Sequence, residues 1–272
     1  MPHPFLVIIL LFLLTRTVPA AGDGIIVVVS IPPQKYLAEM IGGDRIRVTT
    51  MLKPGHGPET YDPVPAQMAL LSNAQIYFLI GVPFETKWRK KFSLQNEKMR
   101  MIETCRYCMI EGRDPHGWTN PVNAIRISEQ IRTALIEADP QGITVYENNF
   151  KTLVEKLEQL DHEIGTKLKD RHTDYFISSH DAWSCFAGRY GLKQLALESG
   201  GREKGPRGIA ELVEIAREEK IKILFIQEQH PTGPAYTLAD ELGARPVVID
   251  PLAENYIENM RQVTALISEA IR

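Results

Sequence analysis

Short apolar runs with strand character alternate along this chain with amphipathic helical segments. Near-continuous apolar strands that alternate with helices imply parallel sheets covered by helices on both faces. Helical periodicity is found in intervening stretches such as 34–41, 66–72, 209–220 and 238–242. Four strands are expected before the midpoint and four after it: 25–29, 47–51, 76–80 and 99–102, then 175–178, 194–197, 222–226 and 247–249. The sequence predicts an α/β fold of two lobes, each with a four-stranded parallel sheet flanked by helices.

One long helix is expected between the two sets of strands. After Asp139 and Pro140, apolar residues recur every three or four positions, at Phe150, Leu153, Leu157, Leu160, Ile164 and Leu168. A helix of about thirty residues ending near Lys169 would be roughly 45 Å long, enough to join two lobes. His162 and His172 fall off the apolar stripe and are expected on the surface. The predicted division is an N-terminal lobe at 22–139, a connecting helix at 140–171 and a C-terminal lobe at 172–272.

The N-terminus has the pattern of an export signal. An apolar core at 5–14 precedes the small-residue segment 17–21 (TVPAA), which predicts a signal peptide over 1–21. The core is too short for a permanent membrane span. The cleavage point lacks the Cys that would carry a lipid, so a lipid anchor is not expected. Removing 1–21 leaves 30 basic and 34 acidic residues, a net charge of −4. We expect a soluble periplasmic protein that does not bind nucleic acid or anionic membranes.

Two histidines stand at junctions between strands and helices. In the segment 112–121 (GRDPHGWTNP), Asn120 is a natural helix N-cap and Pro121 fits the first helical turn, so His116 is displayed from the preceding loop. In the segment 176–183 (FISSHDAW), an apolar strand ends at His180. Two imidazoles placed in this way suggest a metal site.

Further metal-competent side chains follow other predicted strands. Ligands of parallel α/β sheets bind beyond the carboxyl ends of the strands, here in the crevice between the lobes. Both lobes supply candidates at these ends: His56, Glu59 and Asp62 after the second strand, Glu228 and His230 after the seventh, and Asp250 after the eighth. A metal site in one shared cleft is therefore expected.

Four motifs occur along the chain in a fixed order: PGxxPxTYDP at 54–63, GRDPH at 112–116, HDAW at 180–183 with YGL at 190–192, and DPL at 250–252. Together they resemble the periplasmic metal-binding proteins of ABC importers for zinc and manganese (ZnuA/TroA-like, cluster A-I). The resemblance covers nearly the whole chain after the signal. It implies two parallel-sheet lobes bridged by a long helix, with the ion held between them by one residue from each motif.

The resemblance puts His116, His180 and Asp250 on the ion. Many members carry a histidine two residues before the tyrosine of the first motif, where this chain has Glu59. Glu59 is favoured as the first ligand and His56 is the alternative, with His230 as a further candidate. Two imidazoles and two carboxylates suit Mn²⁺ or Fe²⁺ as well as Zn²⁺, whereas a third imidazole from His56 or His230 favours Zn²⁺. Zinc is favoured because the intrinsic affinity of such sites for zinc exceeds their affinity for manganese.

The implied function is a monomeric receptor that captures a divalent transition metal and passes it to an ABC permease in the membrane. A metal-dependent hydrolase is an alternative, with Glu59 or Glu228 as general base, but it requires an open coordination position for water. A surface adhesin of the same fold is the other alternative. No nucleophile elbow, phosphate loop or dinucleotide fingerprint supports another catalytic function, so we do not expect an enzyme.

The remaining motif residues have structural interpretations. Cys105 and Cys108 are expected to form a local disulfide, unless one of them pairs with Cys185, and one of the three cysteines stays unpaired either way. Asp181 and Asp114 are expected to cap turns or to accept an imidazole N–H. Aromatic residues are expected to pack around the ligand loops: Trp118, Trp183, Phe186 and Tyr190.

Overall fold

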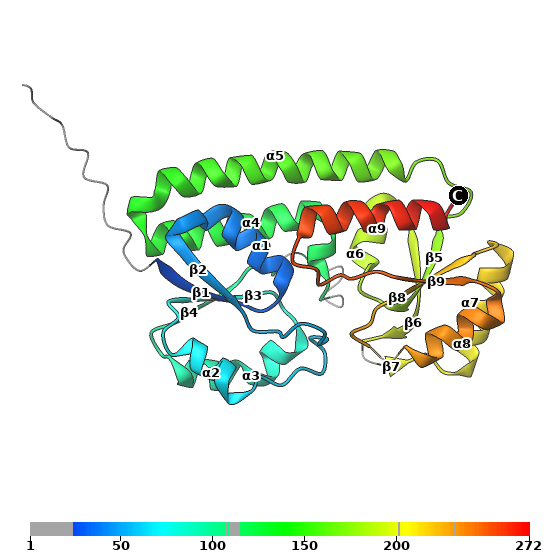
Figure 1. The fold of residues 1–272 in the computed structure, drawn as a ribbon, viewed down its shortest axis with the longest axis horizontal. Helices are drawn as coiled ribbons and strands as arrows, with labels where there is room; N and C mark the ends of the chain where they lie inside the picture. Colours follow the sequence, from blue (N-terminus) through cyan, green and yellow to red (C-terminus); the bar gives the residue numbers. More distant parts are fainter. Residues whose placement is uncertain (1–23, 107, 109–114, 201, 231) are drawn as a thin grey trace, which may run out of the picture.

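The computed structural model describes residues 24–272 with the exceptions of 107, 109–114, 201 and 231. The expected signal peptide at 1–21 and the candidate Asp114 lie outside the described residues. Two α/β lobes lie side by side beneath a layer of long helices (Figure 1).

The N-terminal lobe is a parallel sheet of four strands in the order β2-β1-β3-β4. Its strands are β1 (Ile25–Val29), β2 (Ile46–Thr50), β3 (Ile76–Leu79) and β4 (Arg100–Glu103). Its helices are α1 (Pro32–Gly42), α2 (Pro65–Leu71), α3 (Pro83–Gln95) and α4 (Pro121–Ala138). The four helices all begin with a proline in the first turn, where its missing N–H leaves no hydrogen bond unmade. The four predicted strands are confirmed to within one residue at each end.

The C-terminal lobe contains one strand more than the sequence predicts. Its sheet has the order β7-β6-β5-β8-β9, and β7 pairs antiparallel with β6 while the other strands are parallel. The strands are β5 (Tyr175–His180), β6 (Lys193–Ser199), β7 (Arg202–Glu203), β8 (Ile223–Ile226) and β9 (Arg245–Val248). The helices are α6 (Ser184–Tyr190), α7 (Pro206–Glu218), α8 (Gly233–Leu242) and α9 (Tyr256–Ala270). The prediction of a four-stranded parallel sheet is therefore wrong for this lobe, which has a mixed sheet of five strands. Strand β7 was not predicted because a two-residue strand is too short to show periodicity.

The long helix expected between the lobes is present, and the C-terminal helix packs beside it. Helix α5 (Ile143–Lys167) has 25 residues and is therefore about 38 Å long, somewhat shorter than predicted. Helix α9 runs beside it (Figure 1), and Arg261 of α9 forms an ion pair of 2.8 Å with Glu163 of α5. His162 on α5 is exposed, as is His172 beyond its end. The connecting helix is confirmed, and α9 strengthens the connection.

One hydrophobic core runs through both lobes. It includes β1 and β3, the buried stripe of α5, and Phe176 and Phe225 of the second sheet. A separate cluster fills the other face of that sheet, where Ile177 and Leu224 contact residues of α7 and α8 such as Leu212 and Leu238. Because the larger core is continuous between the lobes, a change in their relative position would disturb buried packing.

Buried hydrogen bonds also join the lobes close to the predicted site. The indole Nε1 of Trp118 donates to the Pro251 carbonyl at 2.8 Å, and the Tyr256 hydroxyl donates to the Trp118 carbonyl at 2.8 Å. Trp118 and Tyr256 are both almost completely buried. The turn that follows His116 is thereby tied to the C-terminal lobe.

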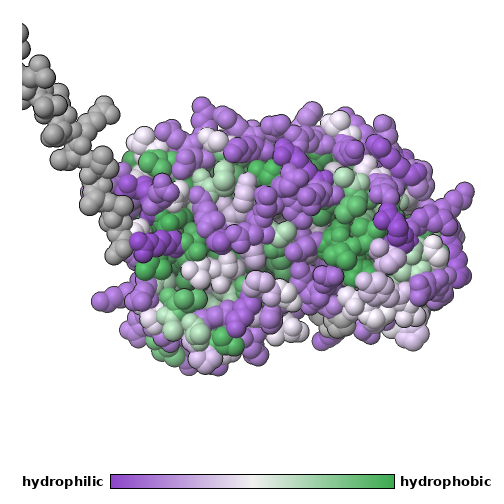
Figure 2. Space-filling model, in the orientation of Figure 1, coloured by the Kyte–Doolittle hydropathy of each residue, from purple (hydrophilic) through white to green (hydrophobic). Residues whose placement is uncertain are grey.

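The surface is mostly hydrophilic on the side drawn in Figure 2, especially along α5, with apolar side chains visible below it in both lobes. None of the helices within the described residues combines the length and the apolar character needed to cross a membrane.

A buried carboxyl closes the turn between β3 and α3. Glu85 accepts hydrogen bonds from the backbone N–H groups of Ile80 and Gly81, both at 2.8 Å. Gly81 has φ +98°, a conformation that favours glycine. Burial raises the pKa of Glu85 to about 7, although these hydrogen bonds and one from Ser30 oppose the shift. Glu85 therefore titrates near neutral pH within the N-terminal lobe.

Replacing Tyr256 by Phe should lower the free energy of unfolding by about 1–2 kcal/mol, because the buried Trp118 carbonyl would lose its donor. Chemical denaturation of the purified protein measures this loss. Tyr236, an exposed tyrosine on α8, is the matched control, and its Phe variant should change stability by less than about 0.5 kcal/mol. Equal effects of the two substitutions would contradict a structural role for the Tyr256 hydroxyl.

Glu85 should make the protein less stable as the pH rises from about 4.5 to about 7. In this window the native carboxyl keeps a proton that the unfolded chain has released, so the native state binds more protons and stability falls with increasing pH. The upper limit is on the order of 3 kcal/mol. Denaturation of the wild type and of Glu85→Gln at pH 5 and pH 8 measures how much the free energy of unfolding falls between the two pH values. This fall should shrink or reverse in the variant. Gln substitution at the exposed Glu97 serves as control; a Glu85→Gln profile parallel to the wild type would disprove the effect.

Candidate metal centre

His116 is presented by a short turn that the sequence builds as predicted. The Asn120 side chain accepts the backbone N–H of Val122 and Pro121 begins α4, which ends the loop at the helix N-terminus. Residues Gly117–Thr119 form a 3-10 turn, and the Thr119 hydroxyl donates to the His116 carbonyl at 2.9 Å. The imidazole is only 3% exposed and meets the Trp118 ring edge-on at 5.2 Å between centroids. These contacts restrict the direction in which His116 can point.

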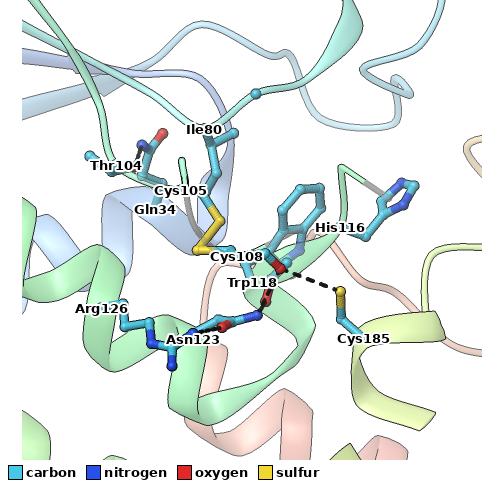
Figure 3. The surroundings of a disulfide bond; sticks show 12 residues. Gln34, Ile80, Thr104, Cys105, Cys108, His116, Trp118, Asn123, Arg126 and Cys185 are labelled. Carbon is cyan, nitrogen blue, oxygen red and sulfur yellow. Dashed lines mark hydrogen bonds between the residues drawn. A yellow bond between two sulfur atoms is a disulfide. The ribbon is translucent and has the colours of Figure 1, made fainter. Parts of the chain in front are cut away.

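A disulfide lies directly behind this turn. Cys105 and Cys108 are bonded to each other, which decides between the pairings that the sequence leaves open. Gly117 packs so closely on them that a Cβ at this position would lie 2.5 Å from Cys108 Cβ. Figure 3 shows the Asn123 amide in the same region, where its Nδ2 donates to the carbonyls of Cys108 and Gly117, both at 3.1 Å. Cys185 of the other lobe is a buried thiol whose Sγ lies 3.8 Å from the Cys108 carbonyl.

His180 is the last residue of β5 and is 1% exposed. Its carbonyl accepts hydrogen bonds from the Ser178 hydroxyl at 2.8 Å and the Gln194 amide at 2.7 Å. The parallel register pairs His180 with Glu198 on β6, so both side chains leave the sheet at the same edge. The strand thus ends with its final side chain in the space between the lobes.

Glu59 reaches this space from the loop between β2 and α2. Gly57 lets the loop approach the other lobe, because a Cβ there would lie 3.0 Å from Glu59 Oε2, 3.4 Å from the Gln229 carbonyl and 3.5 Å from His230 Nε2. His230 follows β8, and its ring stacks on that of His180 at 3.9 Å between centroids and 18° between planes. The loop of one lobe therefore closes directly over two imidazoles of the other.

The donor atoms of four side chains converge. His116 Nε2 lies 3.2 Å from Glu59 Oε1 and 3.4 Å from His180 Nε2, while His180 Nε2 lies 3.4 Å from the same Glu59 oxygen. His230 Nε2 lies 3.6 Å from Glu59 Oε2. Each lobe contributes two of the four side chains, and three imidazoles surround one carboxylate.

The electrostatics of this cluster favour a bound cation. Burial alone would raise the pKa of Glu59, but hydrogen bonds and charge interactions with His116 and His180 outweigh it and hold the pKa well below its usual value. Burial, and then the charge of His180, lower the pKa of His230 and favour its neutral form, which has a lone pair available. Among the described residues, Glu59 Oε2 is a buried oxygen that accepts no hydrogen bond. An anionic oxygen of this kind is suited to a positive ion.

The structure brings together some of the predicted site residues and separates others. Within the described residues, two groups have ligand atoms within 4.8 Å of one another: Glu59 with His180 and His230, and His116 with His180 and Asp181. His56, Asp250 and Glu228 belong to neither group. His56 is exposed, its Nδ1 is 3.1 Å from the Pro54 carbonyl, and its ring meets Tyr61 edge-on. Glu228 is exposed.

Asp250 lies in the loop that follows β9 and makes a different set of contacts. Its Oδ1 accepts hydrogen bonds from the Gln229 amide and the Leu252 backbone N–H, both at 2.8 Å. Burial raises the pKa of its carboxyl. Asp250 thus supports the loop that follows β9 and neighbours the segment that carries His230.

The aromatic residues surround the site unequally. Trp118 contacts His116, whereas Trp183 packs on Phe186 and Phe186 packs on Tyr190, whose hydroxyl donates to Asp161 of α5 at 2.8 Å. The last three therefore join the second lobe to the connecting helix.

Glu198 is a residue of this centre that the sequence analysis missed. Its Oε1 lies 3.4 Å from His180 Nδ1 and its Oε2 lies 3.5 Å from His230 Nδ1. A pocket of about 230 Å³ leads to the cluster, with Glu59, Glu198, Glu203 and His230 among its lining residues. The signal that would have revealed Glu198 is its position at the carboxyl end of the strand next to β5.

Comparison with known proteins agrees with this architecture. Residues 27–270 match the family model ZnuA, described as "Zinc-uptake complex component A periplasmic". The zinc-binding lipoprotein AdcA of Streptococcus pneumoniae is 27% identical over 93% of this chain, and the chain spans 57% of that relative's length. The manganese-binding lipoprotein MntA of Halalkalibacterium halodurans is 26% identical over 88% of this chain and 86% of its own.

A crystal structure of ZnuA superposes on this chain with a TM-score of 0.87 and 33% sequence identity, covering 92% of this chain and 100% of the other. The superposition shows that this chain shares its two-lobed fold with that structure. The chain therefore belongs to the ZnuA family of periplasmic zinc-uptake components.

Proposed function

We propose that this protein is a receptor that binds one Zn²⁺ ion between its lobes and delivers it to an ABC permease in the membrane. The observation that carries the proposal is the spacing of Glu59 Oε1, His116 Nε2 and His180 Nε2, which lie 3.2–3.4 Å from one another. Ligand atoms about 2.0–2.1 Å from a tetrahedral Zn²⁺ are separated by about 3.3 Å along each edge. The three atoms are thus already spaced as three corners of a zinc site, with His230 Nε2 beside them.

The donor set favours zinc over manganese. Three imidazoles and one carboxylate are typical of Zn²⁺, whereas Mn²⁺ prefers sites richer in oxygen. Relatives of this chain are named for zinc and for manganese, so the family alone does not select the ion. The selection rests on His230, whose imidazole adds the third nitrogen donor.

The arrangement suits capture better than catalysis. Three imidazoles and a carboxylate fill a four-coordinate zinc ion and leave no position for an activated water, which a zinc hydrolase requires. The family description names a component of an uptake complex and not an enzyme. Neither the hydrolase nor the adhesin alternative gains support from this geometry.

Release requires the lobes to separate by a small amount. Because Glu59 and His116 belong to one lobe and His180 and His230 to the other, a rotation would divide the ligands into two weak pairs. The continuous core and the pair of helices α5 and α9 oppose a large rotation. We propose that docking on the permease supplies the free energy for this step.

We also propose where the receptor is located and how its chain is divided. The family is described as periplasmic, and we infer an exported monomer that binds no nucleic acid and has a signal peptide at 1–21. Several relatives are lipoproteins, so mass spectrometry of the mature protein is the test for a lipid anchor. The proposed divisions remain 22–139, 140–171 and 172–272.

Purified protein should bind one zinc ion per chain. Substituting Glu59, His116 or His180 by Ala should weaken zinc binding by more than about 100-fold, since substitution of residues that only support ligands already lowers metal affinity by about 10–100-fold. Elemental analysis and chelator competition on the wild type and the Ala variants measure this. His56→Ala, in the same loop as Glu59, is the matched control and should bind like the wild type. Absence of stoichiometric metal, or binding indifferent to His116→Ala, would overturn the receptor assignment.

His230 and Asp250 are alternatives for the fourth ligand, and one comparison separates them. His230→Ala should weaken zinc binding strongly, because its Nε2 lies 3.6 Å from Glu59 Oε2. Asp250→Asn keeps an oxygen for the Leu252 N–H and should weaken zinc binding by no more than about tenfold, the lower limit of the range for residues that support ligands. The reverse result, loss in Asp250→Asn and none in His230→Ala, would restore the ligand set that the family resemblance implies.

A further inference from the structure

Glu198 occupies a distinctive position relative to the site. It belongs to β6, where the parallel register places it beside His180, and the antiparallel register pairs it with Glu203 of β7. Its side chain is 15% exposed. The function proposed above does not use this carboxylate as a ligand.

The two histidines of the C-terminal lobe each lie between two carboxylates. On one side, the Nε2 atoms of His180 and His230 face Glu59 at 3.4 and 3.6 Å. On the other side, the Nδ1 atoms face Glu198, one on each oxygen, at 3.4 and 3.5 Å. The nearly parallel stack of the two rings makes this double contact by a single carboxylate possible.

A metal-bound imidazole needs a partner for its second nitrogen. When Nε2 ligates an ion, Nδ1 of the neutral ring carries the proton and requires an acceptor, which also fixes the orientation of the ring. His180 Nδ1 is buried and lies 3.4 Å from Glu198 Oε1, but the angles do not meet the criteria for a hydrogen bond. The neighbouring Asp181 lies on the Nε2 side of this ring, at 3.7 Å. Glu198 is therefore the carboxylate placed to accept from Nδ1.

We propose that Glu198 is a positioning residue that accepts the Nδ1–H of both His180 and His230 and so holds both Nε2 atoms toward the ion. The proposal rests on the receptor function above. One carboxylate fixes the protonation pattern of two ligands and makes both imidazoles better donors. It also joins the two ligands of the C-terminal lobe into one unit, so that they approach or leave the ion together.

The chain offers a matched control for the charge of Glu198. Glu203 pairs with Glu198 across the β6–β7 hairpin and lines the same pocket, but it is exposed. Glu203→Gln removes the same charge close to the same opening. It therefore separates general attraction of a cation from direct support of the histidines.

The test combines zinc affinity with the histidine ring protons. Chelator competition should show about 10–100-fold weaker zinc binding in Glu198→Gln and Glu198→Ala, and less than about threefold in Glu203→Gln, because exposed charges are screened by salt. In proton NMR of the zinc-loaded wild type, His180 and His230 should show Nδ1–H signals protected from exchange. Both signals should lose protection in Glu198→Ala, while that of His116 remains. Thermal unfolding of the metal-free variants checks that the fold is retained.

Each failure has its own signature. If the wild type binds no zinc, the receptor function fails and the role of Glu198 fails with it. If the wild type binds zinc but the Glu198 variants bind as tightly, or weaken no more than Glu203→Gln, only the positioning role is overturned. The wild-type spectrum also decides without any variant, because zinc-loaded protein with protons on Nε2 of His180 and His230 would contradict the proposal.

Discussion

The contact between the Glu59 carboxylate and imidazoles from both lobes is the interaction on which the rest of the structure depends. Burying a carboxylate is unfavourable unless hydrogen bonds or positive charge compensate it. Here the compensation comes from His116 on the same lobe and from His180 on the other, each within 3.4 Å of Glu59 Oε1. The lobes must therefore be held in register to a fraction of an ångström, and a cation placed among these atoms would reinforce the same arrangement.

The scaffold explains how such register is maintained. Helix α5 joins the two lobes and α9 packs beside it, the main core is continuous, and Trp118 and Tyr256 add buried hydrogen bonds beside the His116 turn. The Cys105–Cys108 disulfide supports that turn from behind through Gly117. Rigid support of this kind keeps ligands prearranged and limits release to small motions.

Local signals made much of this predictable from sequence. The apolar strands, the Asn120–Pro121 helix start and the strand ending at His180 each depend on neighbouring residues, and the structure confirms them. Features that depend on register or tertiary packing were missed. The two-residue β7 has no periodicity, Glu198 meets His180 only through strand pairing, and Glu85 becomes notable only once it is buried. The ligand ranking of His230 and Asp250 likewise depends on how two separate loops approach one another.

Charge balance gives a physical reason for a carboxylate at position 59 with a histidine at 230. A Zn²⁺ ion among neutral imidazoles would leave two positive charges in a largely buried site, which is unfavourable without nearby anions. Glu59 on the Nε2 side and Glu198 on the Nδ1 side together bring the formal charge to zero. The two carboxylates lie on opposite sides of the stacked rings, so that each balances charge at a different nitrogen of the same two imidazoles.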